Sequence, residues 1–547
     1  MADKVAGTSS SSGLSAKKSA RKAYRTVEQI PSESSEIDAS DSDDEWLPDK
    51  ASANARISDS GDEDAEGDEV AEGDEVAEVE PPVRVQAQKK SRNIWKMKDN
   101  QFEGDLPPFL GEWKLNVEGT EAIDFFMHLF PEDLIDDIVQ NSNLYAFQNG
   151  KENLALTTKE MKTFLGMNMA MSYIRYPRSR MYWSSEEGLS LDLIANAMPV
   201  NRFEQILRFI HFVDNSSQEP GNAERLFKIR PVLNQKTFLS AVNPEEMQSI
   251  DEQTIPFKVW VTAGSSGYVY RFEVYQGVAG RGPVSALGMA PDVVMHLCDD
   301  IQQKNHKVFF DNLFCTIPLI QALQQQGTYG TGTCRKNWLR GAQLKLKDEK
   351  QLQTEGRGAC SVVTNAENIT VTRWLDSSVI HMASSCAGQS PSDLAQRWSK
   401  KEKEMLNVPR PFAVKLYNQH MGGVDLMDQL VAMYPRRRKN KRWYMRVFFH
   451  FLDVTTVNAW HLYRMSGLEN KNLLHFKTSV ARALINAAVS KPTPEIRFGP
   501  GSHWPLLTEA KNANRCHDAA CTRKTKYICM HCLVALCPGC FANFHSR

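Results

Sequence analysis

YNQHMGGVDLMDQ, residues 417–429, places two aspartates, Asp425 and Asp428, three residues apart behind a pair of glycines. Gly422 and Gly423 predict a sharp turn of the backbone, because glycine adopts conformations that other residues avoid. If a helix begins at this turn, both carboxylates share one of its faces, since residues i and i+3 are neighbours on a helix. Carboxylate oxygens are ligands of hard divalent cations. The plainer alternative is an acidic pair that complements the positive end of the helix dipole.

A basic run follows this acidic pair in the chain. It consists of Arg436, Arg437, Arg438, Lys439, Lys441 and Arg442, and it ends in Trp443. Cationic side chains bind the phosphates of nucleic acids, and a tryptophan can stack on an exposed base. Carboxylates beside such a run indicate metal-assisted chemistry on a nucleic acid. Two alternatives stay open: a solvated basic surface, and a core tryptophan at the start of a buried helix.

The charge of the chain is strongly segregated. The formal net charge of the 547 residues is only -1, but residues 36–80 contain 19 Asp and Glu against two basic residues. The rest of the chain has 63 Lys and Arg against 47 Asp and Glu. A basic body with an acidic tail is typical of a nucleic-acid-binding protein rather than of an enzyme that acts on small molecules.

Residues 1–100 are predicted to form a disordered acidic tail, because they contain few apolar residues to offset chain entropy. A candidate nuclear localisation signal, or simply a solvated basic cluster, consists of Lys17, Lys18, Arg21, Lys22 and Arg25. No apolar signal segment opens the chain, which disfavours secretion. The apolar run 444–463 contains Arg446, His450 and Asp453, so we expect a buried helix and no membrane partner.

The spacing of apolar residues divides the remaining chain into helical and α/β parts. Thr157 and Glu160 form a capping box before apolar residues at helical spacing, which predicts a helix. Strands alternating with helices between residues 248 and 335 predict an α/β domain. The expected order is residues 101–247, helical; 248–335, core; 336–407, insertion; 408–434, core; 435–495, helical; 496–513, linker; and 514–547, cysteine-rich module.

Two further aspartates lie on or directly after expected strands of the α/β part. Asp251 lies within the strand expected over residues 248–257, and Asp311 directly follows the strand expected over residues 307–310. Functional groups collect just beyond the carboxyl ends of the strands in such sheets. Asp311 is therefore a candidate site residue. The alternative for Asp311 is an ordinary Asp–Asn turn that ends the strand.

Six of the 11 cysteines fall within the last 32 residues. The candidate metal ligands of this segment are Cys516, Cys521, Cys529, Cys532, Cys537, Cys540 and His545. So many thiolate and imidazole groups in a short segment predict zinc, and two tetrahedral sites need eight ligands. We expect the eighth from His517 or His531. In one cross-braced arrangement of the ligands, one zinc site contains Cys516, Cys521 and Cys537. The other contains Cys529, Cys532, Cys540 and His545.

Three separated motifs together resemble the piggyBac family of DNA transposases and their transposon-derived relatives. The motifs are SIDEQTIPF at residues 249–257, VFFDNLFCTIPL at residues 308–319 and the GGVD stretch. The resemblance implies a multidomain α/β protein with an RNase H-like core, flanked by a helical domain for dimerisation and DNA binding. It also implies that Asp251, Asp311 and Asp425 bind Mg²⁺ or Mn²⁺, with Asp428 close to the site.

The activity implied by the resemblance is cut-and-paste transposition of double-stranded DNA. The excised DNA would carry hairpin ends as an intermediate, and a homodimer would join it to target DNA at TTAA sequences. The candidate localisation signal would place the protein in the nucleus. The zinc module would recognise transposon ends or, alternatively, dock a protein.

One departure from the family concerns the strand of Asp251. Family members carry a Lys-, Arg-, Gly- and Pro-rich segment after this strand, whereas Lys258 here runs straight into Val259. Antiparallel neighbours need a turn, and the first one available is at residues 263–267. We therefore expect one long strand over residues 249–262, and either a lost strand or a displacement of Asp251 from Asp311. Three functions stay open: an active transposase, a domesticated DNA-binding protein without catalysis, and a zinc-dependent adaptor that binds proteins through its acidic tail.

Overall fold

The computed structural model describes residues 94–151, 154–219, 224–233, 236–255, 257–277, 284–400, 402–436, 440–486, 503–509 and 512–545. The predicted tail up to residue 93, with its basic cluster, lies outside the described residues, as does residue range 496–502 of the linker. Residues 94–100, which the sequence assigned to the tail, belong to the folded body. Trp95 is buried there, and Lys96 forms a β-bridge with Thr364.

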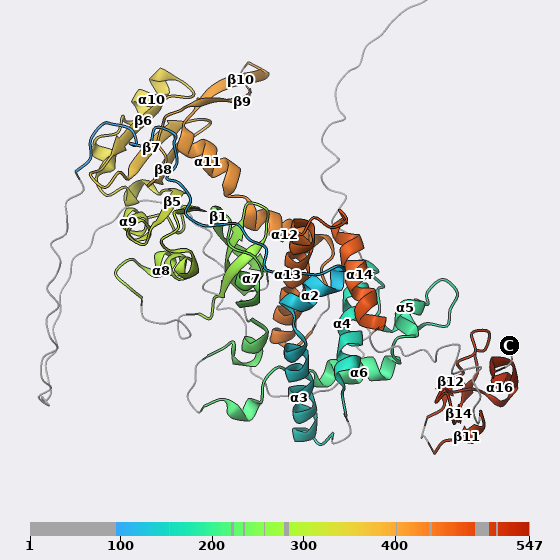
Figure 1. Ribbon diagram of the computed structural model, residues 1–547. Helices are drawn as coiled ribbons and strands as arrows, with labels where there is room; N and C mark the ends of the chain where they lie inside the picture. Colours follow the sequence, from blue (N-terminus) through green and yellow to red (C-terminus); the bar gives the residue numbers. More distant parts are fainter. Residues whose placement is uncertain are drawn as a thin grey trace, which may run out of the picture. The chain divides into compact units, whose positions relative to one another are not determined.

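The helical part combines two separate segments of the chain. Its helices are α2 (Ala122–Leu129), α3 (Glu132–Gln148), α4 (Thr158–Tyr173), α5 (Asp192–Ala195), α6 (Val200–Phe209), α7 (Lys236–Ala241), α13 (Trp443–Met465) and α14 (Leu473–Asn486). α14 packs along α4 and α13 packs against α2 (Figure 1). Their apolar faces share one large core, so the late helices return to the early ones.

Two helices of this part show how the local sequence sets the structure. The Thr157 hydroxyl accepts a hydrogen bond from the Glu160 N–H at 3.2 Å, and the Glu160 carboxylate accepts one from the Thr157 N–H. The predicted capping box at the start of α4 is therefore confirmed. α13 is buried along almost its whole length, as expected from its apolar run. Within the described ranges, no helix has the length and apolarity that crossing a membrane requires.

An eight-stranded sheet forms the α/β part. Its strands are β1 (Met247–Ile255), β2 (Phe257–Gly264), β3 (Val269–Val274), β4 (His306–Phe310), β5 (Thr328–Thr333), β6 (Cys360–Thr364), β7 (Thr370–Leu375) and β8 (Val379–Ser384), in the order β3-β2-β1-β4-β5-β8-β7-β6. β1 to β3 are antiparallel neighbours, and β4 and β5 run parallel to β1. The packing helices are α8 (Met289–Leu297), α9 (Ile317–Gln325), α11 (Phe412–His420) and α12 (Gly423–Met433).

The expectation of one long strand over residues 249–262 is wrong. β1 ends at Ile255 and β2 begins at Phe257, and these two residues are paired with each other, so the chain reverses between them. A tight hairpin thus replaces the longer family segment. Because the reversal keeps both strands in the sheet, Asp251 pairs with Val261 on one side and its strand pairs with β4 on the other.

Residues 336–407, expected as an insertion, extend the same sheet through β6, β7 and β8. β8 joins the core by pairing with residues Thr331 to Thr333 of β5. α10 (Glu349–Glu355) precedes these strands, and a separate two-stranded ribbon of β9 (Asp393–Ser399) and β10 (Glu404–Arg410) follows them. The domain boundaries stay predictions.

Candidate functional site

Asp251 and Asp311 occupy adjacent positions of neighbouring parallel strands. In the pairing of β1 with β4, Ile250 lies opposite Phe310, so the next residue of each segment is an aspartate. β4 ends at Phe310, and Oδ1 of Asp311 accepts a hydrogen bond from the Leu313 N–H at 2.8 Å. Asp311 therefore stabilises a turn, as the plainer interpretation expected, and also lies beside the strand of Asp251.

α12 carries the other two aspartates to this region of the sheet. It begins at Gly423, which confirms the expected helix, and the chain turns at Met421 and Gly422 between α11 and α12, although Gly422, with φ −78°, does not need the conformational freedom of glycine. Gly423 instead gives room for close packing. A Cβ atom there would lie 2.7 Å from Oγ of Ser249 and would also collide with the Gly264 carbonyl. The Val424 N–H donates to the same Ser249 hydroxyl at 3.2 Å, which fixes the start of the helix on β1.

Electrostatic repulsion connects Asp251, Asp311 and Asp425. Burial raises the pKa of Asp251 to about 6; the Glu252 backbone N–H opposes this rise, whereas the charges of Asp311 and Asp425 add to it. Burial also raises the pKa of Asp311, and the Glu252 carboxylate adds to that rise. Carboxylate oxygens are ligands of hard divalent cations, and such a cation would relieve this repulsion. Within the described residues, the groups of three or more ligand atoms that lie within 4.8 Å of one another are both in the cysteine-rich module, so the three carboxylates interact through their charges but are not gathered at that spacing.

Asp428 lies half-buried against β1, whereas Asp425 is exposed. Oδ1 of Asp428 accepts a hydrogen bond from the side-chain amide of Gln253 in β1. Burial raises the pKa of Asp428, the Gln253 hydrogen bond lowers it, and the charge of Asp425 raises it again. The two aspartates of α12 thus interact with each other, as their spacing predicted, but only Asp428 bonds to the strand.

Two arginines of the basic run make contacts within the helical part. Nε of Arg436 donates to Asn168 of α4 at 3.0 Å, and its backbone N–H donates to the Asp453 carboxylate at 2.9 Å. The Arg442 guanidinium donates to backbone carbonyls at the end of α6, including that of Arg208 at 3.1 Å. Both arginines therefore help to hold helices together, a role that the run of positive charge does not indicate.

Trp443 begins α13 and packs, partly buried, against the helical core. Its ring meets the Tyr444 ring edge-on, with centroids 5.9 Å apart. This placement favours the core interpretation over base stacking. Lys441 is exposed, whereas Arg437, Arg438 and Lys439 lie outside the described residues. The DNA-binding role of the run stays a prediction.

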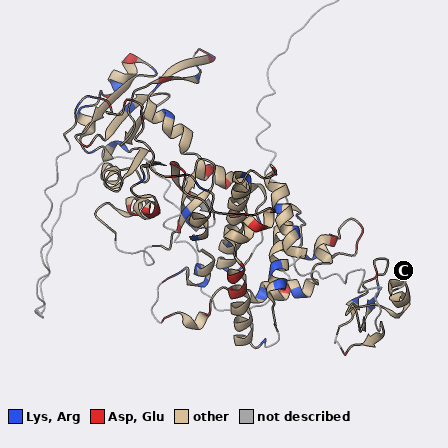
Figure 2. Ribbon diagram, viewed as in Figure 1, with Lys and Arg blue, Asp and Glu red and all other residues tan. Residues whose placement is uncertain are grey.

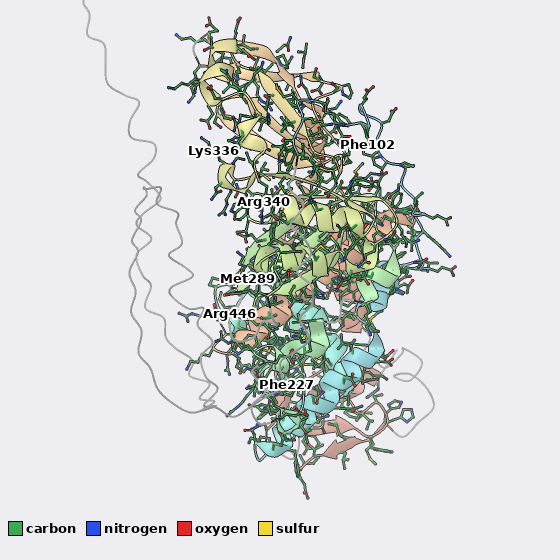
Figure 3. The ribbon with its side chains drawn as sticks, turned by 90° about the vertical axis from the view of Figure 1, so that its left-hand side faces the viewer. Phe102, Phe227, Met289, Lys336, Arg340 and Arg446 are labelled. Carbon is green, nitrogen blue, oxygen red and sulfur yellow. The ribbon has the colours of Figure 1, made fainter. Side chains whose placement is uncertain are left out.

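A second basic segment, residues 335–345, was missed by the sequence reasoning. Nε of Arg335 lies 3.4 Å from Oδ1 of Asn312, the residue after Asp311, and the Arg335 charge lowers the pKa of Asp311 against the effect of burial. Lys336 and Arg340, labelled in Figure 3, extend from the same segment and are exposed. The sequence signal for this segment was the Arg335-Lys336 pair, which follows β5 after one intervening residue; β5 is the neighbour of β4 in the sheet.

Tyr417, the first residue of the quoted stretch, also lies near the carboxylates. Burial raises the pKa of its phenol to about 12; a hydrogen bond with Thr333 opposes the rise, and the charges of Asp311 and Asp251 add to it. The phenol is therefore a neutral hydrogen-bonding group beside the acidic cluster at neutral pH. The signal for Tyr417 in the sequence was its place at the start of the motif that contains Asp425 and Asp428. In the structure it lies in α11, ahead of α12.

The cysteine-rich module contains two groups of candidate metal ligands. Its elements are β11 (Pro505–Leu507), β12 (Asn514–Arg515), β13 (Lys524–Thr525), β14 (Tyr527–Cys529) and α16 (Pro538–His545). The first group consists of Cys516, Cys521, Cys537 and Cys540, whose sulfur atoms all lie within 4.8 Å of one another. Four thiolates at this spacing can form a closed tetrahedral site.

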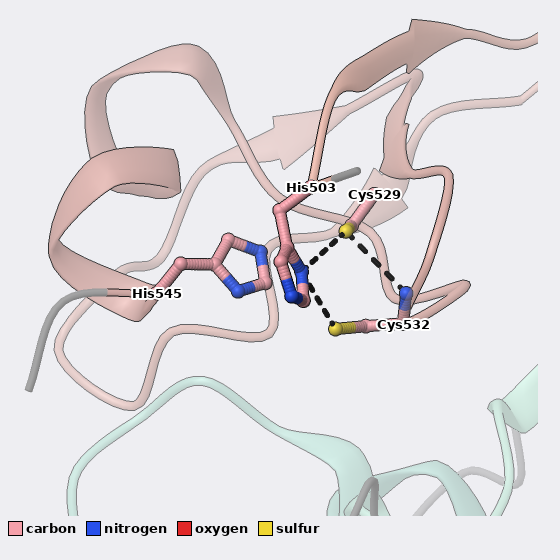
Figure 4. A group of neighbouring side chains, drawn as sticks. All are labelled: His503, Cys529, Cys532 and His545. Atoms are coloured by element: carbon pink, nitrogen blue, oxygen red, sulfur yellow. Dashed lines mark hydrogen bonds between the residues drawn. The ribbon is translucent and has the colours of Figure 1, made fainter. Parts of the chain in front are cut away.

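The second group consists of His503, Cys529, Cys532 and His545, again with ligand atoms within 4.8 Å (Figure 4). Nδ1 of His503 lies 3.5 Å from the sulfur of Cys529 and 3.4 Å from that of Cys532. The structure therefore places His503, from the expected linker, as the eighth candidate ligand, where the sequence suggested His517 or His531.

The proposed partition was also wrong in one ligand. Cys540 lies with the first group rather than with Cys529 and Cys532. Pairing of β11 with β14 brings His503 to the second group, because Pro505 lies opposite Cys529. Spacing within the module could not show this, because His503 lies just before β11 and precedes all six cysteines.

The hairpin of β12 and β13 is rich in basic residues; Lys and Arg are blue in Figure 2. Four exposed basic residues lie on or next to its two strands: Arg515, Arg523, Lys524 and Lys526. The structure shows no ion pair for these four side chains within the described ranges. They are therefore available to phosphates.

Comparison with known proteins agrees with this arrangement. A family model described as Transposase IS4 matches residues 121–460. The human PiggyBac transposable element-derived protein 2 is 28% identical over 91% of this chain and 92% of its own length, and protein 3 of the same human group is 28% identical over 78% and 76%. A cryo-EM structure of a piggyBac transposase synaptic complex with hairpin DNA has a similar fold, with a TM-score of 0.56 at 17% identity over 77% of this chain and 98% of that one. The resemblance seen in the motifs is confirmed, and the chain belongs to the piggyBac family of transposases and their transposable element-derived relatives.

Proposed function

We propose that this protein binds double-stranded DNA and cleaves and transfers DNA strands with divalent metal held by Asp251, Asp311 and Asp425. The observation that carries the proposal is the strand register, in which the residues after Ile250 and Phe310 are both aspartates, with α12 packed on the same strand β1. Three antiparallel strands that lead into two parallel ones support an RNase H-like core.

Bound Mg²⁺ or Mn²⁺ would activate a water or a 3′-hydroxyl and stabilise the leaving oxygen. The residues of the chain have separate tasks around it. The three aspartates hold the cation, and Asp428 adds negative charge next to Asp425. Arg335, near Asn312 after β4, is placed to bind a backbone phosphate beside the site. Tyr417 supplies a neutral hydroxyl for a hydrogen bond to the same DNA strand.

The wider setting follows from the family and the cysteine-rich module. Zinc in the two ligand groups would fold the module and present its exposed basic hairpin to transposon-end DNA. We further propose a homodimer that joins DNA at TTAA targets in the nucleus. The solved relative, a piggyBac transposase in a synaptic complex with hairpin DNA, supports the DNA partner.

A strand-cleavage assay tests the proposal. Labelled duplexes with candidate transposon ends are incubated with the full chain and either Mg²⁺, Mn²⁺ or a chelator. We expect nicking with either metal and none with the chelator. Asp311→Asn should abolish nicking, whereas Asp105→Asn, at an exposed position outside any helix or strand, should leave it unchanged. Metal-independent nicking, or nicking by the Asp311 variant, would contradict the proposed site.

DNA binding without catalysis is the second candidate. The exposed basic side chains on the β12–β13 hairpin favour it, because they could bind phosphates without any need for the aspartates. It predicts salt-sensitive DNA binding that survives Asp311→Asn and weakens when the zinc is removed. The cleavage assay separates the two candidates, since only the first predicts nicked product.

A further inference from the structure

A buried chain of hydrogen bonds connects α13 to the acidic helix α12. His450 of α13 hydrogen-bonds Gln253 of β1, with Nε2 at 2.9 Å from Oε1. The amide nitrogen of the same glutamine donates to Oδ1 of Asp428 in α12. Gln253 is 1% exposed and His450 is 7% exposed, so water has little access to this connection.

The chemistry of the three groups fixes the direction of these hydrogen bonds. An ionised carboxylate only accepts, so Gln253 must present its amide nitrogen to Asp428. The amide oxygen is then left for His450, whose Nε2 must carry the hydrogen. Burial lowers the pKa of His450 to about 4, so the ring is a neutral donor at pH 7. The arrangement therefore has one consistent set of donors and acceptors, and it restricts where the Asp428 carboxylate can lie.

A second buried contact holds the far end of α12. Nζ of Lys477 donates to the carbonyl of Tyr434, the residue after α12, at 2.7 Å and pairs with Asp453 of α13 at 2.6 Å. His450 and Asp453 are three residues apart and so share one face of α13. One face of α13 therefore holds α12 at Asp428 and again at its C-terminal end.

We propose that His450 and Gln253 are positioning residues, which hold Asp428 and, through α12, Asp425 in place for the metal. The inference rests on the proposed function, because it concerns the same carboxylates. Neither residue touches the cation. Residues that support metal ligands in this way typically change metal affinity about 10- to 100-fold when they are replaced.

Manganese binding tests the proposal without need of catalysis. The full-length, zinc-loaded chain is titrated with Mn²⁺, and free Mn²⁺ is read by electron paramagnetic resonance. His450→Leu should weaken binding about 10-fold, because the Gln253 amide then loses its fixed orientation. His450→Gln should restore binding, because the glutamine amide can place an N–H where the Nε2 hydrogen was. If the leucine variant does not fold, Gln253→Met breaks the same connection and should weaken binding equally.

A matched control separates positioning from general loss of stability. Asn458 of α13 accepts a hydrogen bond from the Val269 N–H of β3 at 2.9 Å and donates one back at 2.8 Å, with no contact to the carboxylates. Asn458→Leu should therefore lower the melting temperature but keep wild-type Mn²⁺ affinity. Wild-type affinity in His450→Leu, or an equal loss in Asn458→Leu, would overturn the inference. If the wild type shows no Mn²⁺ binding that Asp311→Asn removes, the proposed metal site itself fails, and the inference with it.

Discussion

Replacing Asp251 by asparagine should stabilise the metal-free protein at pH 7.5. Burial and the neighbouring carboxylates raise the pKa of Asp251 from its ordinary 3.8 to about 6. A raised pKa means that the folded state binds the proton more tightly than the unfolded state, so the wild type loses stability as pH rises from about 4 through about 6. Asparagine has a similar shape without the charge and removes this loss.

The size of the gain follows from the shift. About two pH units correspond to about 3 kcal/mol, and partial exposure of Asp251 to solvent reduces the expected gain to about 1–2 kcal/mol. The melting temperature should rise by about 1–2 °C, because the entropy of unfolding grows with the size of the folded body. The assay is thermal unfolding in chelator at pH 7.5 and pH 4.5, with Asp105→Asn, at an exposed position outside any helix or strand, as the unchanged control.

The pH comparison decides whether charge is the cause. At pH 4.5 the folded wild type already holds the proton on Asp251, so the gain from asparagine should shrink to a fraction of its value at pH 7.5. Added Mn²⁺ at pH 7.5 should raise the melting temperature of the wild type more than that of the variant. An equal gain at both pH values, or a variant that melts below the wild type at pH 7.5, would refute the reasoning.

Three further predictions concern packing, zinc and DNA. Gly423→Ala should lower the free energy of unfolding by about 1–3 kcal/mol, because the added Cβ pushes α12 off β1, whereas Gly422→Ala, with open space around it, should change little in a denaturant titration. His503→Ala should reduce bound zinc from about two ions per chain to about one in native mass spectrometry, whereas His531→Ala should keep both; the reverse would contradict the ligand assignment. Arg335→Ala should weaken DNA binding and reduce the slope of log affinity against log salt by about 1 in fluorescence anisotropy, and an unchanged slope would exclude a phosphate contact.

Much of the local structure was predictable because its causes lie within a few residues. The capping box of Thr157 and Glu160 gives the start of α4, and the i, i+3 spacing of Asp425 and Asp428 gives two interacting carboxylates on α12. The placement of Asp311 directly after a buried strand was also visible in the sequence. These signals depend on propensities and spacings rather than on contacts between distant segments.

The parts that sequence reasoning missed depend on contacts across the fold. Pro256, directly after Ile255, was a turn signal that the expectation of one long strand did not use, whereas the pairing of β1 with β2 depends on the sheet as a whole. His503 reaches its metal group only because β11 pairs with β14. Arg436 and Arg442 look like phosphate ligands in the sequence, but tertiary packing supplies Asn168 and backbone carbonyls as their partners. Charge alone therefore could not separate binding residues from structural ones.

The most direct test of the central claim is the location of manganese in crystals of the protein by anomalous scattering. If Asp251, Asp311 and Asp425 bind divalent metal, one or two manganese peaks should lie within coordination distance of them, and Asp311→Asn should remove these peaks. Ordered carboxylates without such a peak at saturating Mn²⁺, or peaks that remain in the Asp311→Asn variant, would contradict metal binding by these aspartates.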